Sequence, residues 1–397
     1  MAVAAGPSGV RGFARLAVTY TANDLGDQIG LVALAILVFD QTGSALAPAS
    51  LFLVARSVPA LLAPALQASI DRRPTRLVLP TIYLLEAVAF TALAVLSHDF
   101  SLAAVLVIAF ADGILALTGR AITRATLALV LRPHGLLREG NNIVNVCFSV
   151  SNMVGPVIGG VVVAVGGPAW GLGIDAALFL VMAAVMALPF PWPTPEGDPG
   201  GWRDRLRAGL AYARRTPGVG SLIAADGASI VPMCLVVPIL VVYAKESLGT
   251  GDAGYGILQG AWGGGIVIGS ILLLRFRRGS LRNIIATGLL AVGVSYVGIG
   301  ISPVIVLACV ASVVGGVGNG IESVTLITAV QALVSDDLMG RVSTLMESVA
   351  ACAMGIGFAL GGAITDVFDP RVTYVASGIA VLLCVPLVAR AVRTEDK

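Results

Sequence analysis

The stretch from Phe190 to Gly218 reads FPWPTPEGDPGGWRDRLRAGLAYARRTPG and interrupts a chain that is otherwise strongly apolar. Its first part is rich in proline and glycine, which is typical of a linker. Its second part, WRDRLRAGLAYARR, alternates arginine with leucine, tryptophan and tyrosine at helical spacing. This pattern predicts an amphipathic helix on a membrane surface. We therefore predict one bundle over residues 1–190, a linker with an amphipathic helix over residues 191–218, and a second bundle over residues 219–397.

The composition places most of this chain in a lipid bilayer. Only 12% of its 397 residues are charged and 57% are hydrophobic, whereas about a quarter of the residues of a soluble domain are charged. Each side of the linker holds six apolar stretches of membrane-spanning length, and these must be helical because hydrocarbon offers the backbone no hydrogen-bond partners. The expected fold is an all-α membrane protein with twelve transmembrane helices in two pseudo-symmetric six-helix bundles. The predicted spans are Leu16–Phe39, Leu46–Ile70, Leu77–Leu96, Leu102–Leu131, Asn141–Val165, Ala169–Pro189, Val219–Ala244, Ala253–Leu274, Leu281–Ile301, Val304–Val334, Val342–Thr365 and Val372–Ala391.

Basic residues set the expected orientation of these spans. If the N-terminus is cytoplasmic, 20 lysines and arginines fall in inner loops and tails, and only Lys245 and Arg371 fall in outer loops. The positive-inside rule then puts both termini in the cytoplasm of a multi-pass protein of the cell (cytoplasmic) membrane. The net charge of +2 reflects this bias, so we expect no nucleic-acid partner.

Signatures of an enzyme are missing from the sequence. The two histidines, His98 and His134, lie in predicted loops, and the chain has no Walker loop and no Cys/His cluster with metal-binding spacing. We therefore expect no enzymatic activity, no cofactor and no metal site. Any transport energy must then come from an ion or substrate gradient.

The two predicted bundles show a faint internal repeat. A shift of 202 residues places GPVIGG in the first half on GFALGG in the second. The same shift places Asp24 on Asp226 and Arg120 on Glu322. Parallel six-helix repeats around a site at the membrane midplane are a common transporter plan, with chance similarity among glycine-rich helices as the alternative.

Acidic residues inside the predicted spans are candidates for proton coupling, because charges at membrane depth are costly unless they are paired, neutralised or hydrated. Asp24 and Asp27 are three residues apart and share one helix face, so they could hold one proton between them. Alternatively, one of them pairs with an arginine and the other orients helix packing. Asp226 and Glu322 are the corresponding candidates in the second half.

Arginines inside the spans are candidates for lining a substrate cavity. Arg120 and Arg124 lie four residues apart on one helix face, where they would bind an anionic substrate or hold the acids of the first helix. Arg56 lies in the middle of a span and is expected to pair with an acid such as Asp27. We also place Asp112 in this predicted cavity set.

Several motifs, in order along nearly the whole chain, are similar to those of one transporter family. They are LGDQIGLVAL and DQTGSAL around the first span, LVARSVPALLAP in the second, QASIDRRPTR after it, GPVIGG in the fifth, DAALFLVMA in the sixth, and GNGIESVTLITAVQALVSDDLMGRVSTL across the tenth and eleventh. The chain thereby resembles the major facilitator superfamily, and within it the exporter branch that includes enterobactin, macrolide and multidrug efflux proteins.

This resemblance implies alternating access, with the first, fourth, seventh and tenth spans lining a central cavity, and proton-driven export of a small amphipathic molecule. It also implies roles for two groups of residues. The loop residues Asp71, Arg72 and Arg76 match the superfamily loop that closes the inner gate, although Gln67 replaces its glycine. Gly155, Pro156, Gly159 and Gly160 match the end of the antiporter motif, although Ser151 and Asn142 replace its upstream glycines.

The sequence therefore predicts a proton-coupled exporter of a drug or a secreted metabolite. Its expected partners are a small-molecule substrate, protons and the lipid bilayer, and we expect a monomer. A lipid or lysolipid flippase, or another gradient-independent facilitator of the same fold, is the main alternative. A membrane sensor that no longer transports is a weaker one, because it would need an accessory domain or a long tail.

Overall fold

The computed structural model describes residues 7–10, 12–62, 75–189, 192, 202–275 and 280–392, and these are almost entirely helical. Long apolar runs form helices here because hydrocarbon offers the backbone no other hydrogen-bond partner, and the breaks between them fall mainly at glycine, serine and proline. The helices are α1 (Phe13–Thr42), α2 (Leu46–Phe52), α4 (Thr75–Leu96), α5 (Leu102–Leu131), α6 (Leu137–Gly166), α7 (Pro168–Ala187), α8 (Trp202–Arg215), α9 (Pro217–Leu235), α10 (Leu240–Val242), α11 (Gly251–Arg275), α12 (Leu281–Ile301), α13 (Ile305–Leu333), α14 (Asp336–Val367) and α15 (Pro370–Ala391).

The helices confirm an all-α membrane fold. Within the described ranges, eleven helical segments are long and apolar enough to cross a membrane. A shorter apolar helix, Leu46–Leu62, begins where the predicted span Leu46–Ile70 begins, and the rest of that span lies outside the described residues. The total of twelve spans therefore stays a prediction.

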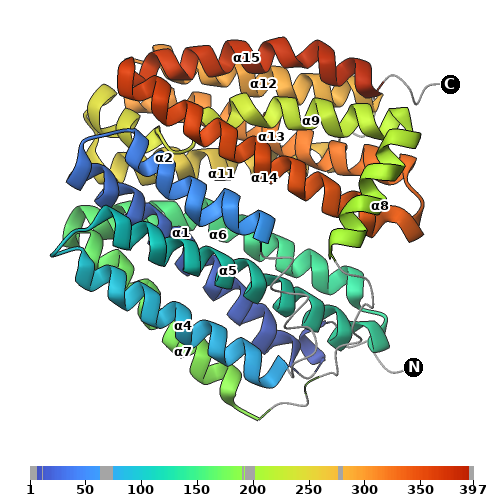
Figure 1. The fold of residues 1–397 in the computed structure, drawn as a ribbon, viewed down its shortest axis with the longest axis horizontal. Helices are drawn as coiled ribbons and strands as arrows, with labels where there is room; N and C mark the ends of the chain where they lie inside the picture. The colour runs from blue at the N-terminus through green and yellow to red at the C-terminus, as the bar shows by residue number, and fades with distance from the viewer. Residues whose placement is uncertain are drawn as a thin grey trace.

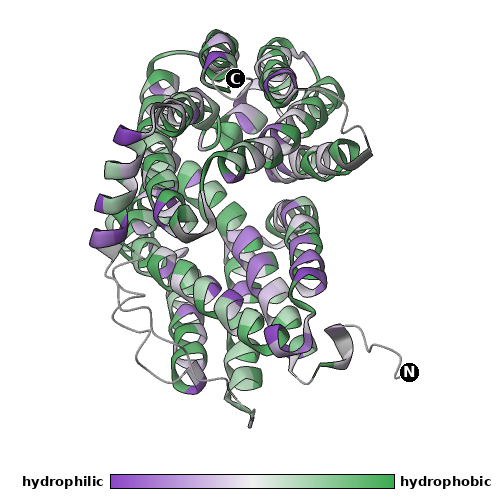
Figure 2. Cartoon of the chain, turned by 90° about the vertical axis from the view of Figure 1, so that its right-hand side faces the viewer, coloured by the Kyte–Doolittle hydropathy of each residue, from purple (hydrophilic) through white to green (hydrophobic). Residues whose placement is uncertain are grey.

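The helices form two groups that lie side by side (Figure 1). One group holds α1 to α7 and the other holds α9 to α15, with α8 at one end of the molecule. Both chain termini lie at that same end, which we call the terminal end, and the other end is the opposite end. Viewed toward the terminal end, most helical turns are hydrophobic, with scattered hydrophilic segments (Figure 2).

Two pairs of helices join the groups, and small residues let their backbones approach closely. Where α6 packs on α11, a Cβ added at Gly160 would lie only 3.0 Å from the Cα of Gly256. Where α14 packs on α2, a Cβ at Gly362 would lie 3.2 Å from the Cα of Leu46. Both contacts lie in the part of each helix nearer the opposite end, where the two groups are therefore in close contact.

Polar contacts link the groups at the opposite end as well. Lys245 forms ion pairs with Asp40 at the end of α1 and, at 2.6 Å, with Asp252 at the start of α11. Asp366 of α14 accepts hydrogen bonds from the Ser44 hydroxyl at 2.8 Å and from the Ala45 amide at 3.0 Å. These contacts tie loops of the first group to the second.

The predicted span Val219–Ala244 is interrupted in the structure. α9 ends at Leu235, residues 236–239 are non-helical, and the chain becomes helical again at Leu240. Pro238 has no amide hydrogen to continue the helical ladder, and its ring disfavours a helical conformation in the preceding residue. The whole segment Gly218–Ser247 is still one of the eleven membrane-spanning stretches, so the predicted span is confirmed, but the prediction did not include this irregular turn within it.

α8 coincides with the amphipathic helix predicted after the linker, and it packs on the second group. The Gly209 side of α8 lies so close to α14 that a Cβ there would meet the backbone of Arg341. The Tyr212 hydroxyl donates to the carbonyl oxygen of Leu333 at 3.5 Å. The five cysteines are free thiols.

Candidate functional site

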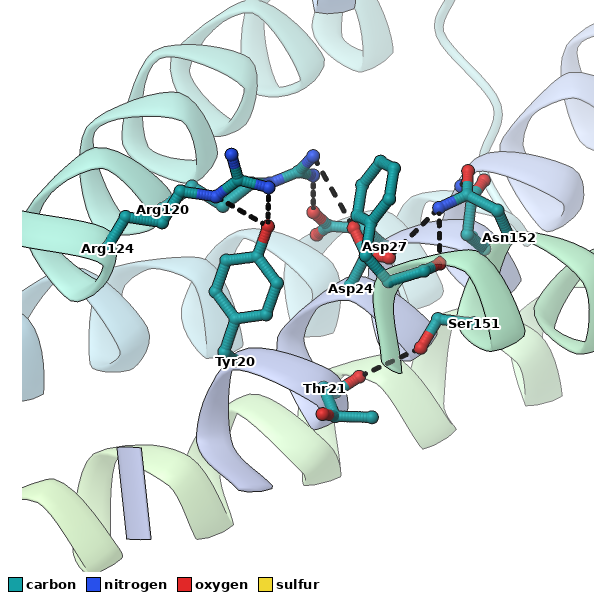
Figure 3. Close-up of polar contacts among 10 residues, drawn as sticks. Tyr20, Thr21, Asp24, Asp27, Arg120, Arg124, Ser151 and Asn152 are labelled. Atoms are coloured by element: carbon teal, nitrogen blue, oxygen red, sulfur yellow. Dashed lines mark hydrogen bonds and ion pairs between the residues drawn. The ribbon is translucent and has the colours of Figure 1, made fainter. Parts of the chain in front are cut away.

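The centre of the first helix group contains a buried ion-pair cluster between α1 and α5. The Arg120 guanidinium forms an ion pair with Asp27 through its Nη2 atom and lies 3.5 Å from Asp24 Oδ1 through its Nη1 atom (Figure 3). The two aspartates are 1% and 7% exposed. The structure thus brings together three predicted site residues, and one arginine faces both acids.

Amide side chains extend this cluster to α6. Asn152 Nδ2 donates to Asp24 Oδ2 at 3.1 Å, and Gln28 Nε2 donates to Asn152 Oδ1 at 2.5 Å. Ser151 Oγ also donates to the carbonyl oxygen of Thr21 at 3.4 Å (Figure 3). Sequence analysis did not assign Gln28 or Asn152 to the site, although an amide inside an apolar span is a signal that could have drawn attention to both.

Arg124 lies one turn along α5 and has a different partner. Its Nε and Nη2 atoms donate to the Tyr20 hydroxyl at 3.0 and 2.7 Å, and its guanidinium lies 5.3 Å from the centre of the Tyr20 ring. A guanidinium over an aromatic face gains cation–π stabilisation. Among the described residues, no carboxylate is recorded within ion-pair distance of Arg124.

Arg56 and Asp112 line one small cavity with the Asp27–Arg120 ion pair. This cavity has a volume of about 40 Å³, enough for an ordered water. Arg56 lies in a widened helical turn, Leu53–Ser57, that continues α2, and such π-type turns are frequent at functional sites. Gly113 of α5 permits this turn to approach, because a Cβ there would meet the Ala55 backbone. Arg56 therefore shares a cavity with Asp27, while the recorded ion pair of Asp27 is with Arg120.

Two further acids are fully buried beside this cluster. Glu86 of α4 and Asp175 of α7 are each 0% exposed, and their four carboxylate oxygens have no hydrogen-bond partner in the described part of the chain. The Asp175 carboxylate fits against α1 only because residues 26 and 30 are glycines, since a Cβ at either would meet its oxygens. The first helix group thus encloses more acids than bases.

The second helix group holds a different pair at the repeat-related positions. Asp226 of α9 and Glu322 of α13 are 9% and 6% exposed, so both carboxylates lie inside the second helix group. Glu322 packs against α12, where a Cβ at Gly288 would lie 3.1 Å from its own Cβ. No ion pair to either acid is recorded among the described residues. The repeat thus relates an acid–base pair in one group to an acid–acid pair in the other.

The glycine motif of α6 lies at the contact between the two groups. Gly155 and Gly159 face α1, where Cβ atoms would lie 2.7 Å from the Gln28 Cβ and 3.1 Å from the Ile29 Cα. Gly160 faces α11, and the Pro156 carbonyl lies against Gly256 of the same helix. These residues permit α6 to pack tightly on both sides.

The predicted gating loop falls largely outside the description. Asp71 and Arg72 belong to the undescribed residues 63–74, and Arg76 is exposed in the first turn of α4. Their proposed closure of an inner gate stays a prediction.

Comparison with known proteins places this chain in a family. Residues 4–396 match the family model described as transmembrane secretion effector. The chain belongs to this family. It is therefore a multi-pass membrane protein and a transporter of the major facilitator type, as the sequence motifs indicated.

Curated relatives are similar over most of the chain. The enterobactin exporter EntS of Escherichia coli O139:H28 (strain E24377A / ETEC) is 27% identical over 292 residues, which cover 71% of this chain and 68% of the relative. The enterobactin exporter EntS of Escherichia fergusonii has the same identity and coverage.

Solved structures share the fold at low sequence identity. The nucleoside transporter NupG matches with a TM-score of 0.76 at 12% identity, covering 98% of this chain and 99% of that chain. A bacterial homologue of the iron transporter ferroportin in its inward-facing state matches with a TM-score of 0.74 at 16% identity, covering 97% and 99%. These likenesses concern the fold alone.

Proposed function

We propose that this protein exports a small amphipathic molecule in exchange for protons. In this cycle, the six-helix bundle of residues 1–190 moves against the six-helix bundle of residues 219–397. The central cavity thereby opens to each side of the membrane in turn. We place the protein in the cytoplasmic membrane as a monomer with both termini inside. The export direction is supported by the secretion effector family and by the similarity to enterobactin exporters.

The observation that carries proton coupling is the acid pair Asp226 and Glu322. Asp24 and Asp27 face a common arginine, which offsets their charge, whereas Asp226 and Glu322 are both buried in the second helix group with no base recorded beside them among the described residues. Two carboxylates that share a low-dielectric site repel each other, so at least one of them is expected to take up a proton. A site that binds a proton inside the membrane is what an antiporter requires.

The ion-paired acids supply the second part of the proposed cycle. Asp27 and its ion-pair partner Arg120 both line the small cavity, together with Arg56 and Asp112. When Asp27 takes up a proton, Arg120 loses a partner and becomes free to attract another anion or polar group. Proton binding and cargo binding are coupled if both compete for this one guanidinium.

Alternating access is supported by the kind of contact between the two groups. Glycines and short polar side chains make the close contacts at the opposite end, together with the ion pairs of Lys245. Lys245 and its two partners keep part of their surface exposed, and ion pairs open to solvent contribute little free energy each, so such a contact can break and re-form during a cycle. We expect the molecule in this conformation to be closed at the opposite end, and we propose that Asp71, Arg72 and Arg76 close the inner gate in the other state.

The test is gradient-driven uptake of the amphipathic dye Hoechst 33342 into inside-out vesicles that are acidic inside. Wild type should accumulate the dye, whereas Asp27→Asn and Glu322→Gln should each lose accumulation while still equilibrating dye along its own gradient. Asp99→Asn is the matched control, because Asp99 is an exposed loop acid. Full accumulation in both Asp27→Asn and Glu322→Gln would refute the proton-coupling role.

The same vesicles separate this proposal from the flippase and facilitator alternatives. Dye movement in wild type that is equal with and without the pH gradient would favour facilitated exchange. A fluorescent lysophospholipid that crosses only protein-containing vesicles, also without a gradient, would favour a lipid flippase.

A further inference from the structure

The break in the seventh predicted span lies beside a cavity within the second helix group. Residues 236–239 are non-helical, and two carbonyl groups just before them are bonded by side chains: Tyr296 Oη donates to Met233 O at 3.1 Å, and Ser377 Oγ donates to Pro232 O at 2.6 Å. In a continuous helix, these carbonyls would accept from residues 237 and 236. Irregular backbone at membrane depth persists where it is buried in protein or lines a cavity, and discontinuous helices are typical of transporter binding sites.

The cavity has a volume of about 350 Å³, within the range of small-molecule sites. It is lined from both sides of the break and from α11 to α15, with Val237, Gln259, Trp262, Tyr296, Met354 and Tyr374 among its walls. None of its lining residues in the described chain carries a charge. It is therefore distinct in position and chemistry from the charged cavity around Arg120.

One wall of this cavity is a fixed aromatic surface. The Trp262 and Tyr296 rings stack with centroids 5.3 Å apart and planes at 21°, and the Tyr374 ring meets Tyr296 edge-on at 6.1 Å. The hydrogen bond to Met233 fixes Tyr296, and Gly315 leaves the space that Trp262 occupies, because a Cβ there would meet the indole. Side chains held in this way lose little conformational entropy when a flat ligand packs on them.

One residue of the cavity wall, Gln259, carries a polar atom without a protein partner among the described residues. Gln259 Oε1 is buried and accepts no hydrogen bond from any described residue. A buried acceptor without a donor costs roughly 1–3 kcal/mol. A ligand that donates a hydrogen bond there removes this cost, whereas a purely hydrocarbon ligand does not.

We propose that this cavity binds an uncharged aromatic ring that carries a hydroxyl or amide hydrogen-bond donor, and that it forms the aromatic subsite of the exported molecule. The role of this subsite in transport rests on the proposed export function. Ligand binding to the cavity does not, because binding at equilibrium needs no gradient. Aromatic stacking on Trp262 supplies the apolar part of the affinity, and Gln259 selects the donor.

Equilibrium dialysis of tritiated 2-naphthol against the full-length protein in nanodiscs tests this, with empty nanodiscs as the blank for lipid partitioning. Three ligands form the comparison: 2-naphthol, naphthalene without the hydroxyl, and decahydro-2-naphthol without the aromatic ring. We expect saturable binding of 2-naphthol that is at least about tenfold tighter than that of either analogue, because each lacks one of the two interactions.

Substitutions test whether Trp262 supplies the aromatic packing and Gln259 the hydrogen bond. Trp262→Ala should weaken 2-naphthol binding by about tenfold or more, with Trp170→Ala as the control because Trp170 is 66% exposed on α7. Gln259→Leu, which keeps the side-chain volume, should weaken 2-naphthol but leave naphthalene unchanged. Trp262→Phe keeps a ring and guards against a folding defect in the alanine variant. Equal binding of 2-naphthol and decahydro-2-naphthol to wild type, or unchanged binding in both Trp262→Ala and Gln259→Leu, overturns the subsite.

A failure here is distinguishable from a failure of proton coupling. Glu322→Gln should bind 2-naphthol like wild type while losing gradient-driven dye accumulation. Proton-driven accumulation in wild type without saturable 2-naphthol binding would leave the exporter function standing and remove the aromatic subsite.

Discussion

Removing the arginine that faces two acids is the sharpest test of the charge cluster in the first helix group. In an Arg120→Gln variant, Asp24 and Asp27 keep their burial of 1% and 7% exposure but lose their ion pair. Breaking a buried pair by removal of one partner costs about 3–5 kcal/mol, because the remaining charge is left uncompensated. We expect a loss of this size at pH 8, which corresponds to a roughly 10²- to 10³-fold change in the unfolding equilibrium constant.

The dependence on pH follows from the charge that remains. Protonation of the two carboxylates removes the uncompensated charge, so the loss in Arg120→Gln should shrink when the pH falls from 8 to 5. Neutralising the acids by substitution should have the same effect: Asp27→Asn combined with Arg120→Gln should cost less than the sum of the single changes.

The assay is reversible unfolding by sodium dodecyl sulfate in mixed micelles, followed by circular dichroism, for wild type, the two single variants and the double variant. Arg132→Gln is the control, because Arg132 is exposed after α5. Strict additivity of the two single changes, together with a pH-independent loss, would show that Arg120 does not stabilise the protein through these acids.

Three further outcomes are expected. Lys245→Ala removes two ion pairs at the opposite end. Because surface pairs contribute about 0–1 kcal/mol, the fraction of molecules open at that end should rise by up to about fivefold. Distances between spin labels at Gln41→Cys and Glu246→Cys measure this fraction. Gly30→Ala should lower unfolding stability by about 1–3 kcal/mol, since its Cβ would meet Asp175 and Phe90, whereas Gly173→Ala on α7 meets nothing within 4 Å and should not. Gly256→Val should slow dye transport without loss of folded protein, because its side chain would meet the α6 backbone at Pro156 and Gly160; transport at the wild-type rate would contradict the role of this close contact.

The sequence predicted the helices well because, for a long apolar run in lipid, a helix satisfies the backbone hydrogen bonds within the segment itself. Observed ends differ from predicted ones by a few residues, as in α1, which begins at Phe13 rather than Leu16. The break after Leu235 was missed although Pro232 and Pro238 mark it. A single proline is tolerated in many membrane helices, as Pro156 is within α6, so composition alone does not tell a kink from an interruption.

The charge cluster was only half predictable. Spacing placed Asp24 and Asp27 on one face and Arg120 and Arg124 on another, but it left open which arginine meets the acids. In the structure, Arg120 forms an ion pair with Asp27, and Arg124 donates a hydrogen bond to Tyr20. Which arginine meets the acids depends on how α1 and α5 are rotated against each other. Sequence periodicity fixes faces within one helix and carries no information on the rotation between two.

The aromatic cavity could not be predicted from the sequence. Its rings come from α11, α12 and α15, at positions 262, 296 and 374, so no local pattern joins them. Aromatic residues make up only 6% of the chain. A total says nothing about clustering, and three rings from distant helices are enough to build one wall.

The attachment of α8 has a mechanical consequence. α8 packs on α14 through Gly209 and Tyr212, whereas Arg15 of α1 donates to the Leu188 carbonyl at 3.0 Å and so holds the end of the sixth predicted span to the first helix group. The Arg15 guanidinium also lies 5.9 Å from the centre of the Trp192 ring. The covalent connection that joins the two helix groups therefore runs from Trp192 to Trp202, and the nine residues between them can span at most about 30 Å. In the proposed cycle, this length bounds how far the two attachment points can separate, and the glycine contacts and ion pairs between the groups guide the motion within that bound.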